Sequence, residues 1–297
     1  IPQYPLYSAT IKMFGGVQVN YYPDEENDWA LNRAALENAY TQHAEQGVNI
    51  KAIVVINPGN PTGAILDEGS VHEVIAFAKE RGLAIIADEV YQENLYGGEF
   101  ISFAKALGDE KSVPLFSLHS ISKGFYGECG HRGGYLEVRN APMVAGAALN
   151  FVDLLLKQAS VSLCSNTVGQ IMTYLMVSPP NSKSNVRQEF LAEKEKVLSN
   201  LYEKAVMVRE AFKKMDGMEV FGKTGAMYLF PRLSKLPADT DDFDYCMALL
   251  EETGLCTVNG SGFGLKNHLR IAFLPSKEQL EEVLPRWVAF HNEYVNE

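Results

Sequence analysis

The chain has 297 residues, with 26 Lys and Arg against 37 Asp and Glu, so its formal net charge is −11. Hydrophobic residues make up 46% and charged residues 21%, which is typical of a globular protein and excludes a disordered or fibrous one. The acidic balance argues against binding to nucleic acid or to an anionic membrane, because such binding requires a clustered cationic surface.

The first part of the chain predicts three local structures in order. Ile1–Ser8 resembles neither a signal peptide nor a transit peptide; we expect it to be extended mid-domain sequence, preceded in the natural protein by an N-terminal part. Val17–Tyr22 predicts a strand because apolar and polar residues alternate. Trp29–Gln46 predicts a helix with Asp28 as its N-cap.

Short apolar runs then alternate with a helical pattern. The predicted strands are Lys51–Ile56, Leu83–Ala87, Val113–Leu118 and Gly134–Val138. Between the first two, Asp67–Arg81 carries apolar residues at helical spacing and is followed by Gly82, a typical helix-ending residue. This order predicts an α/β fold with a mostly parallel central sheet sandwiched by helices.

The C-terminal third has a different pattern, which indicates a second and smaller α+β domain. A long polar helix is predicted over residues 185–215, after the helix-breaking pair Pro179 and Pro180. Later segments are predicted as strands at 226–230, 255–258 and 268–273 and as helices at 242–253 and 277–292. We therefore expect a large domain over residues 1–195, incomplete at its N-terminus, and a small domain over residues 196–297.

Cysteine usage points to a reducing compartment. Cys129, Cys164, Cys246 and Cys256 have neither Cys-x-x-Cys spacing nor the rhythm of a disulfide framework, so we expect no metal site. An intracellular location follows, with the cytoplasm favoured over the mitochondrion. The most apolar stretch, residues 144–156, contains Asn150 and Asp153 and is too short to span a membrane.

Polar motifs follow three of the predicted strands, at the position where open parallel sheets bind ligands. They are Asn-Pro-Gly-Asn-Pro-Thr-Gly at 57–63, Asp-Glu-Val-Tyr at 88–91, and Ser-Ile-Ser-Lys-Gly at 120–124 with Arg-Gly-Gly-Tyr at 132–135. Each alone has an ordinary explanation: a turn-rich loop, a helix-capping carboxylate, or a solvated lysine. Arg270 alone is explained as an edge-strand charge.

Together these residue types suit one cofactor. A lysine can form a Schiff base, a buried carboxylate can keep a pyridine nitrogen protonated, and an arginine with hydroxyl groups can bind a phosphate. This is the set of groups that pyridoxal 5′-phosphate requires. The Gly-Ser-Gly-Phe-Gly segment at 260–264 is not a dinucleotide-binding fingerprint, because it lacks the strand-to-helix context.

The motifs make the chain resemble the alanine aminotransferase family, within the class I/II aminotransferases of PLP fold type I. The resemblance covers essentially all 297 residues. It rests on NPGNPTG at 57–63, ADEVYQ at 87–92, SISKGFYGECGHRGGY at 120–135, GAMYLFPR at 225–232 and GSGFG at 260–264. The family's preceding N-terminal segment, which supplies a phosphate-binding turn and dimer contacts, has no counterpart in these residues.

The resemblance implies a role for each matching residue. Lys123 would be the catalytic residue and would form the Schiff base with pyridoxal 5′-phosphate, and Asp88 would pair with the pyridine nitrogen. The other cofactor-binding residues would be Tyr4, which stacks on the ring, Asn60 and Tyr91 at the phenolic oxygen, and Ser120, Ser122 and Arg132 at the phosphate. Asn60 and Arg270 would bind the substrate, with Arg270 holding its α-carboxylate.

The implied reaction is amino-group transfer between L-alanine and 2-oxoglutarate, giving pyruvate and L-glutamate by a ping-pong mechanism in a homodimer. No second arginine is assigned to the distal carboxylate of 2-oxoglutarate. The alternatives are a β-lyase or an aminocyclopropane-carboxylate-synthase-like enzyme of the same fold, or a non-catalytic ligand-sensing domain. The Gly-Glu-Cys-Gly-x-Arg-Gly-Gly-Tyr stretch at 127–135 favours transamination.

Overall fold

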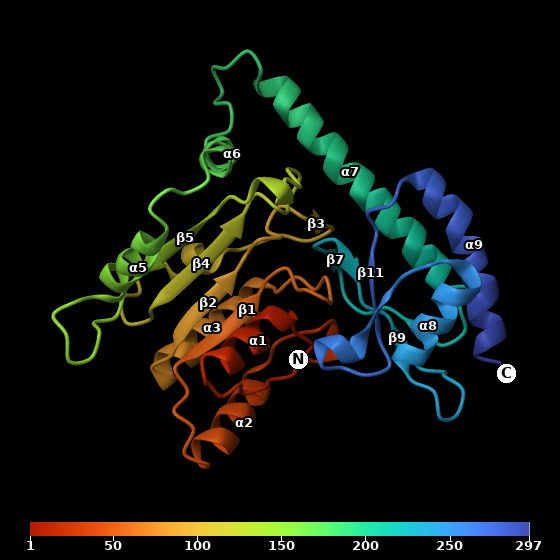
Figure 1. Ribbon diagram of the computed structural model, residues 1–297, viewed down its shortest axis with the longest axis horizontal. Helices are drawn as coiled ribbons and strands as arrows, with labels where there is room; N and C mark the ends of the chain where they lie inside the picture. The colour runs from red at the N-terminus through yellow and green to blue at the C-terminus, as the bar shows by residue number, and fades with distance from the viewer. Residues whose placement is uncertain (297) are drawn as a thin grey trace.

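A four-stranded sheet organises the N-terminal part of the computed structural model, which describes residues 1–296 (Figure 1). The strand order is β1-β2-β4-β5, with β1 at Ala52–Ile56, β2 at Ala84–Asp88, β4 at Leu115–Ser120 and β5 at Gly134–Arg139. The first three strands are parallel and β5 is antiparallel to β4. All four predicted strands are confirmed, and the parallel register brings the C-terminal ends of β1, β2 and β4 to one edge.

The helix predicted between β1 and β2 is confirmed as α3, Glu68–Arg81. The Asp67 side chain accepts a hydrogen bond from the Ser70 N–H at 2.7 Å, which caps its N-terminus, and Gly82 ends it with a φ of 64°. The apolar face of α3 is buried in one hydrophobic cluster with alternate residues of the strands. Its members include Val71, Val74, Phe77 and Ala78 from the helix and Ile53, Val55, Ile85, Ala87 and Leu115 from the sheet.

Two predictions near the N-terminus are wrong in part. Residues 1–8 are not extended throughout, because helix α1 begins at Pro5 and runs to Met13, with proline at a position where its missing N–H costs nothing. Helix α2 spans Arg33–Ala44 and is capped by Asn32 rather than Asp28. Asp28 has a φ of 55° and its carboxylate accepts from the Gly222 N–H at 3.0 Å, so it ties the segment to the C-terminal part instead.

The strand predicted over Val17–Tyr22 does not form. This segment follows the free edge of β1, but its contact there is made by a side chain: the Tyr21 hydroxyl donates to the Val54 carbonyl at 2.8 Å. An alternating pattern gives only a propensity, and a strand also needs backbone groups on a neighbour with which to pair. Val17 and Tyr22 are 64% and 57% exposed, so little burial fixes a register here.

The middle of the chain connects the sheet to the C-terminal part. Its elements are β3 (Leu95–Tyr96), α4 (Phe103–Leu107), α5 (Phe151–Ala159), α6 (Thr167–Val177) and α7 (Arg187–Phe212), with short 3₁₀ helices at Cys129–His131 and Ser160–Ser162. Two further 3₁₀ helices lie outside this region, at Glu25–Asn27 before α2 and at Gly260–Phe263 in the C-terminal part. The long helix predicted over 185–215 is confirmed as α7. Among the described residues, no helix is both long and apolar enough to cross a membrane.

The C-terminal part combines short strands with two helices around its own core (Figure 1). The strands are β6 (Met218–Glu219), β7 (Thr224–Gly225), β8 (Tyr228–Leu229), β9 (Arg232–Leu233), β10 (Val258–Asn259) and β11 (Leu269–Ala272), and the helices are α8 (Asp242–Thr253) and α9 (Lys277–Tyr294). The predicted helices are confirmed, whereas the strands are shorter than predicted. The domain boundary at 195/196 stays a prediction.

A buried polar network joins the end of α7 to α8 and α9. Trp287 Nε1 donates to the Tyr245 hydroxyl at 2.9 Å, and that hydroxyl lies 2.9 Å from His291 Nδ1. His291 Nε2 lies 2.9 Å from the Asp216 carbonyl oxygen, which can only accept, so the proton is on Nε2 and Tyr245 donates to Nδ1. Burial lowers the pKa of His291, which keeps the imidazole neutral.

We expect acid to destabilise this network. The unfolded chain binds a proton at His291 near the ordinary histidine pKa of about 6.5, while the folded chain binds it only at lower pH. The contribution of His291 to the free energy of unfolding is therefore complete above this pH. As the pH falls below it, that free energy decreases by up to about 1.4 kcal/mol per pH unit. In denaturant unfolding from about pH 7 to about pH 5, His291→Gln should flatten this dependence, whereas exposed His72→Gln should not. Equal slopes in wild type and His291→Gln would contradict the assignment.

Candidate active site

The predicted residues meet at the C-terminal edge of the sheet. The register pairs Ile56 with Asp88 and Asp88 with Leu118, so the three loops that follow β1, β2 and β4 begin side by side. From two of these loops, Asn60 Nδ2 donates to the Tyr91 hydroxyl at 3.4 Å. The candidate site is therefore assembled by the sheet topology rather than by residues close in sequence.

Lys123 lies in the loop after β4, next to the loop that follows β2. Its Nζ is 5.5 Å from the centroid of the Tyr91 ring, a cation–π distance. Burial raises the pKa of the Asp88 carboxyl group, and the charge of Lys123 is one of the interactions that oppose this rise. A primary amine thus lies close enough to the Asp88 carboxylate to act on it electrostatically, while the cofactor roles of both residues stay predictions.

The surroundings of Asp88 have opposing effects on the pKa of its carboxyl group. Burial raises the pKa of this carboxyl group, and three interactions oppose the rise: the Tyr7 hydroxyl donates at 2.7 Å, the Val90 N–H donates at 3.4 Å, and Lys123 contributes its charge. Burial also raises the pKa of Tyr7, so its phenol stays protonated and can donate. A cationic ring nitrogen placed beside Asp88 would favour the ionised carboxylate further.

Tyr7 is the functional candidate that sequence reasoning missed. Tyr4, to which the resemblance assigns ring stacking, precedes α1 and is 39% exposed, whereas Tyr7 lies in the first turn of α1 and reaches Asp88. The spacing of three residues in Tyr-Pro-Leu-Tyr was the available signal, because it places both tyrosines near one face of a helical turn. The stacking role of Tyr4 stays a prediction.

Arg270 reaches the site from β11 in the C-terminal part. Its guanidinium carbon lies 4.7 Å from the Tyr228 ring and 4.8 Å from the Phe263 ring, so two aromatic side chains orient it. Its Nη1 donates to Asn60 Oδ1 at 3.3 Å. Asn60 therefore contacts both Tyr91 and Arg270 and links the two parts of the chain.

The residues predicted for the phosphate are only partly brought together. The hydroxyls of Ser120 and Ser122 are 2.9 Å apart, and the Ser122 N–H donates to Ser120 Oγ at 3.0 Å. Arg132 is exposed, and its Nη1 donates to the Cys129 carbonyl at 2.7 Å in its own turn. The serines offer a pair of hydroxyls, while the pairing of Arg132 with them stays a prediction.

The donor set fits pyridoxal 5′-phosphate. An amine is available for its aldehyde, a partly buried carboxylate for its pyridine nitrogen, and phenol and amide groups for its phenolic oxygen, all at one sheet edge. The paired serine hydroxyls suit the phosphate.

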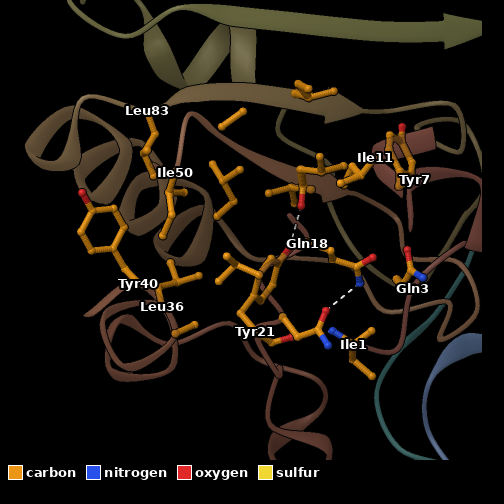
Figure 2. Close-up of a pocket in the computed structure, with 18 of the residues that line it drawn as sticks. Ile1, Gln3, Tyr7, Ile11, Gln18, Tyr21, Leu36, Tyr40, Ile50 and Leu83 are labelled. Atoms are coloured by element: carbon orange, nitrogen blue, oxygen red, sulfur yellow. Dashed lines mark hydrogen bonds between the residues drawn. The ribbon is translucent and has the colours of Figure 1, made fainter. Parts of the chain in front are cut away.

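A large cavity lies beside this site and does not enclose it. Its volume is about 690 Å³, and it follows the free edge of β1, with mainly apolar walls that include Leu36, Tyr40 and Ile50 (Figure 2). It reaches the site only at its end near Tyr7 and Asn60. A smaller cavity of about 380 Å³ is lined by Lys123 and by side chains of α7. Chemistry, rather than cavity size, therefore locates the site.

Comparison with known families and proteins agrees with the geometry. Residues 1–286 match the family described as aminotransferase class I and II. The chain is 40% identical over 316 residues to the probable mitochondrial alanine aminotransferase of Dictyostelium discoideum, covering all of this chain and 58% of that protein. It is 39% identical over 317 residues to glutamate–glyoxylate aminotransferase 2 of Arabidopsis thaliana, covering all of this chain and 64% of that protein. The chain thus spans about three-fifths of the length of these relatives.

Solved structures confirm the fold class. Alanine aminotransferase from Pyrococcus furiosus superposes with a TM-score of 0.81 at 28% identity, over 98% of this chain and 69% of that one. An aspartate aminotransferase from Thermus thermophilus superposes with a TM-score of 0.77 at 21% identity, over 97% of this chain and 71% of that one, and shows the fold alone. The predicted PLP fold type I architecture is therefore confirmed.

Proposed function

Because the chain belongs to the class I and II aminotransferases, we propose that it transfers an amino group between L-alanine and 2-oxoglutarate, giving pyruvate and L-glutamate in a ping-pong cycle with pyridoxal 5′-phosphate. The observation that carries the proposal is the meeting of Lys123, Asp88 and Arg270 around the Asn60–Tyr91 hydrogen bond. Alanine as substrate is supported by the alanine aminotransferases among the relatives.

The protein's contribution to the chemistry follows from these side chains. Lys123 and Asp88 would hold pyridoxal 5′-phosphate, which would supply an electron sink for negative charge at the substrate Cα. Lys123 Nζ, free once the substrate amine is bound, would remove the Cα proton as a general base and pass it to the former aldehyde carbon of the cofactor. Asp88 holds the pyridine nitrogen in its cationic form, and Tyr91 and Asn60 donate hydrogen bonds to the phenolic oxygen. Ser120 and Ser122, with Arg132, bind the phosphate.

Arg270 orients the substrate. A guanidinium can bind a carboxylate through two parallel N–H···O hydrogen bonds, which fixes both the position and the plane of the carboxylate. The two flanking rings and the Asn60 oxygen limit how this guanidinium can turn. The substrate α-carboxylate is thereby held at a set distance from Lys123.

We also propose that the protein acts inside the cell as a homodimer. We favour the cytoplasm over the mitochondrion as its compartment, although the Dictyostelium relative is mitochondrial by name. The domain division at 195/196 is part of the same proposal and is supported by the two large buried clusters, of which one lies before residue 196 and the other, apart from Tyr96, lies after it. Apolar side chains are exposed along α5, α6 and the segment between them. They support the proposal that a second copy of the chain packs on this surface, because large exposed apolar patches mark interfaces. The most exposed are Leu156, Val161, Leu163, Ile171, Tyr174 and Val177, at 54–85%.

Replacing the lysine tests the reaction. Lys123→Ala should abolish both the visible absorbance of the protein-bound cofactor and turnover, a loss of at least the roughly 10²–10⁴-fold that a positioned proton-transfer group contributes. Absorption spectra with added pyridoxal 5′-phosphate, followed by assay with alanine and 2-oxoglutarate, measure both. Lys105→Ala on the exposed surface of α4 is the matched control. Retention of absorbance and turnover in Lys123→Ala would refute the proposal.

Replacing the arginine tests substrate binding. Arg270→Lys keeps the charge but loses the planar fork, so the KM for alanine should rise by roughly 10- to 100-fold. Cofactor affinity, measured by fluorescence titration, should change by less than about threefold because Arg270 is assigned to the substrate. An unchanged KM would count against this role.

Charging the apolar patch tests the dimer. Ile171→Glu introduces a carboxylate where the second copy would pack, so sedimentation should shift from dimer to monomer. Phe243→Glu, at a residue 54% exposed on α8 away from the patch, should leave the dimer intact. A dimer of equal stability in Ile171→Glu would exclude this surface as the interface.

A further inference from the structure

Asn94 is a completely buried amide just behind the candidate site, and all of its hydrogen-bonding groups are used. Its side chain makes three hydrogen bonds, two of them to the same residue. Asn94 Oδ1 accepts from the Gly124 N–H at 2.8 Å, and Nδ2 donates to the Gly124 carbonyl at 3.3 Å and to the Tyr96 hydroxyl at 3.3 Å. A buried amide is retained at little cost only when it is satisfied in this way.

The residue that Asn94 holds is the direct neighbour of Lys123. Gly124 has a φ of 70°, which favours glycine, and a Cβ there would lie 3.4 Å from the Cβ of Glu93. Hydrogen bonds to both its N–H and its carbonyl fix the two peptide planes on either side of Gly124. The first of these planes contains the carbonyl of Lys123. Asn94 therefore restrains the backbone from which the Lys123 side chain extends.

The main chain of Asn94 joins the other two parts of the site. Its N–H donates to the Tyr91 carbonyl at 2.8 Å, and its carbonyl accepts from the Ala226 N–H at 2.9 Å. Ala226 is buried with a φ of 53° and lies two residues before Tyr228, the ring that packs on Arg270. The loop that contains Tyr91 (the tyrosine loop), the loop that contains Lys123 (the lysine loop) and the turn just before β8 are therefore all hydrogen-bonded to Asn94.

We propose that Asn94 is a positioning residue that sets the place of Lys123 Nζ relative to Tyr91 and to the substrate carboxylate at Arg270. This inference rests on the proposed function and deepens it. Only the lysine loop and Tyr96 are held by the side chain, whereas Tyr91 and Ala226 are held by the main chain. Asn94→Ala therefore releases the lysine loop and leaves the other two attachments in place.

The first measurement needs no cofactor. Hydrogen exchange of the full chain, followed by mass spectrometry of peptides over residues 121–126, reports the Gly124 N–H that Asn94 protects. Asn94→Ala should speed exchange there by about tenfold or more, a local opening. Tyr245→Phe, which removes buried hydrogen bonds in the C-terminal core, is the control and should leave this peptide unchanged. Unchanged exchange in Asn94→Ala would overturn the proposal.

The second measurement asks whether the lysine is displaced. Wild type and variants are incubated with pyridoxal 5′-phosphate, reduced with borohydride, and mapped by mass spectrometry for modification at Lys123. Asn94→Ala should label Lys123 more slowly and lower kcat by roughly 10- to 100-fold, with the KM for alanine within about threefold, because Arg270 keeps its place. Tyr245→Phe should lose stability without this split. Asn94→Ser serves if Asn94→Ala does not fold.

The outcomes separate the two claims. If wild type is not labelled at Lys123, the proposed function fails and the inference falls with it. If wild type is labelled and Asn94→Ala is labelled equally fast with an unchanged kcat, the inference alone is overturned. A rise in KM equal to the fall in kcat would also overturn the inference. It would mean that the substitution had disturbed the hydrogen bond between Asn94 and Ala226, and with it Arg270, rather than the lysine loop.

Discussion

The charge of Asp88 is the constraint on which the rest of the site depends. A carboxylate at the end of an inner strand loses solvation, which raises its pKa, and the chain compensates with a phenol, a backbone N–H and an ammonium group. None of these is a buried cation in direct contact with it. The site is therefore suited to a ligand that brings its own positive charge to this position, as a protonated pyridine ring does.

The second constraint is that groups on separate parts of the chain must be held at fixed distances from that carboxylate. Asn60 does this through its side chain, since its amide donates to Tyr91 and its oxygen accepts from Arg270. Asn94 does the same behind the site through its main chain and side chain together. Reaction rates are sensitive to displacements of about 1 Å, so such uncharged residues matter as much as the charged ones.

Sequence alone predicted the part of the fold that depends on local pattern. Strands β1, β2, β4 and β5 and helix α3 follow from short apolar runs and caps, and their order brings the loops that hold Asp88 and Lys123 to one edge of the sheet. The strand predicted over Val17–Tyr22 was wrong because pairing depends on a neighbour that propensity does not report. Tyr7 and Asn94 were missed because their contacts with Asp88 and Gly124 span 81 and 30 residues of sequence. The spacing of Tyr4 and Tyr7 places both tyrosines near one face of a helical turn but does not show which residue Tyr7 contacts.

The most direct test of the central claim is a crystal structure of the chain soaked with pyridoxal 5′-phosphate. We expect continuous density from Lys123 Nζ to the cofactor, with the pyridine nitrogen facing Asp88 and the phosphate near Ser120 and Ser122. Density joined to another lysine, or a ring nitrogen turned away from Asp88, would contradict it.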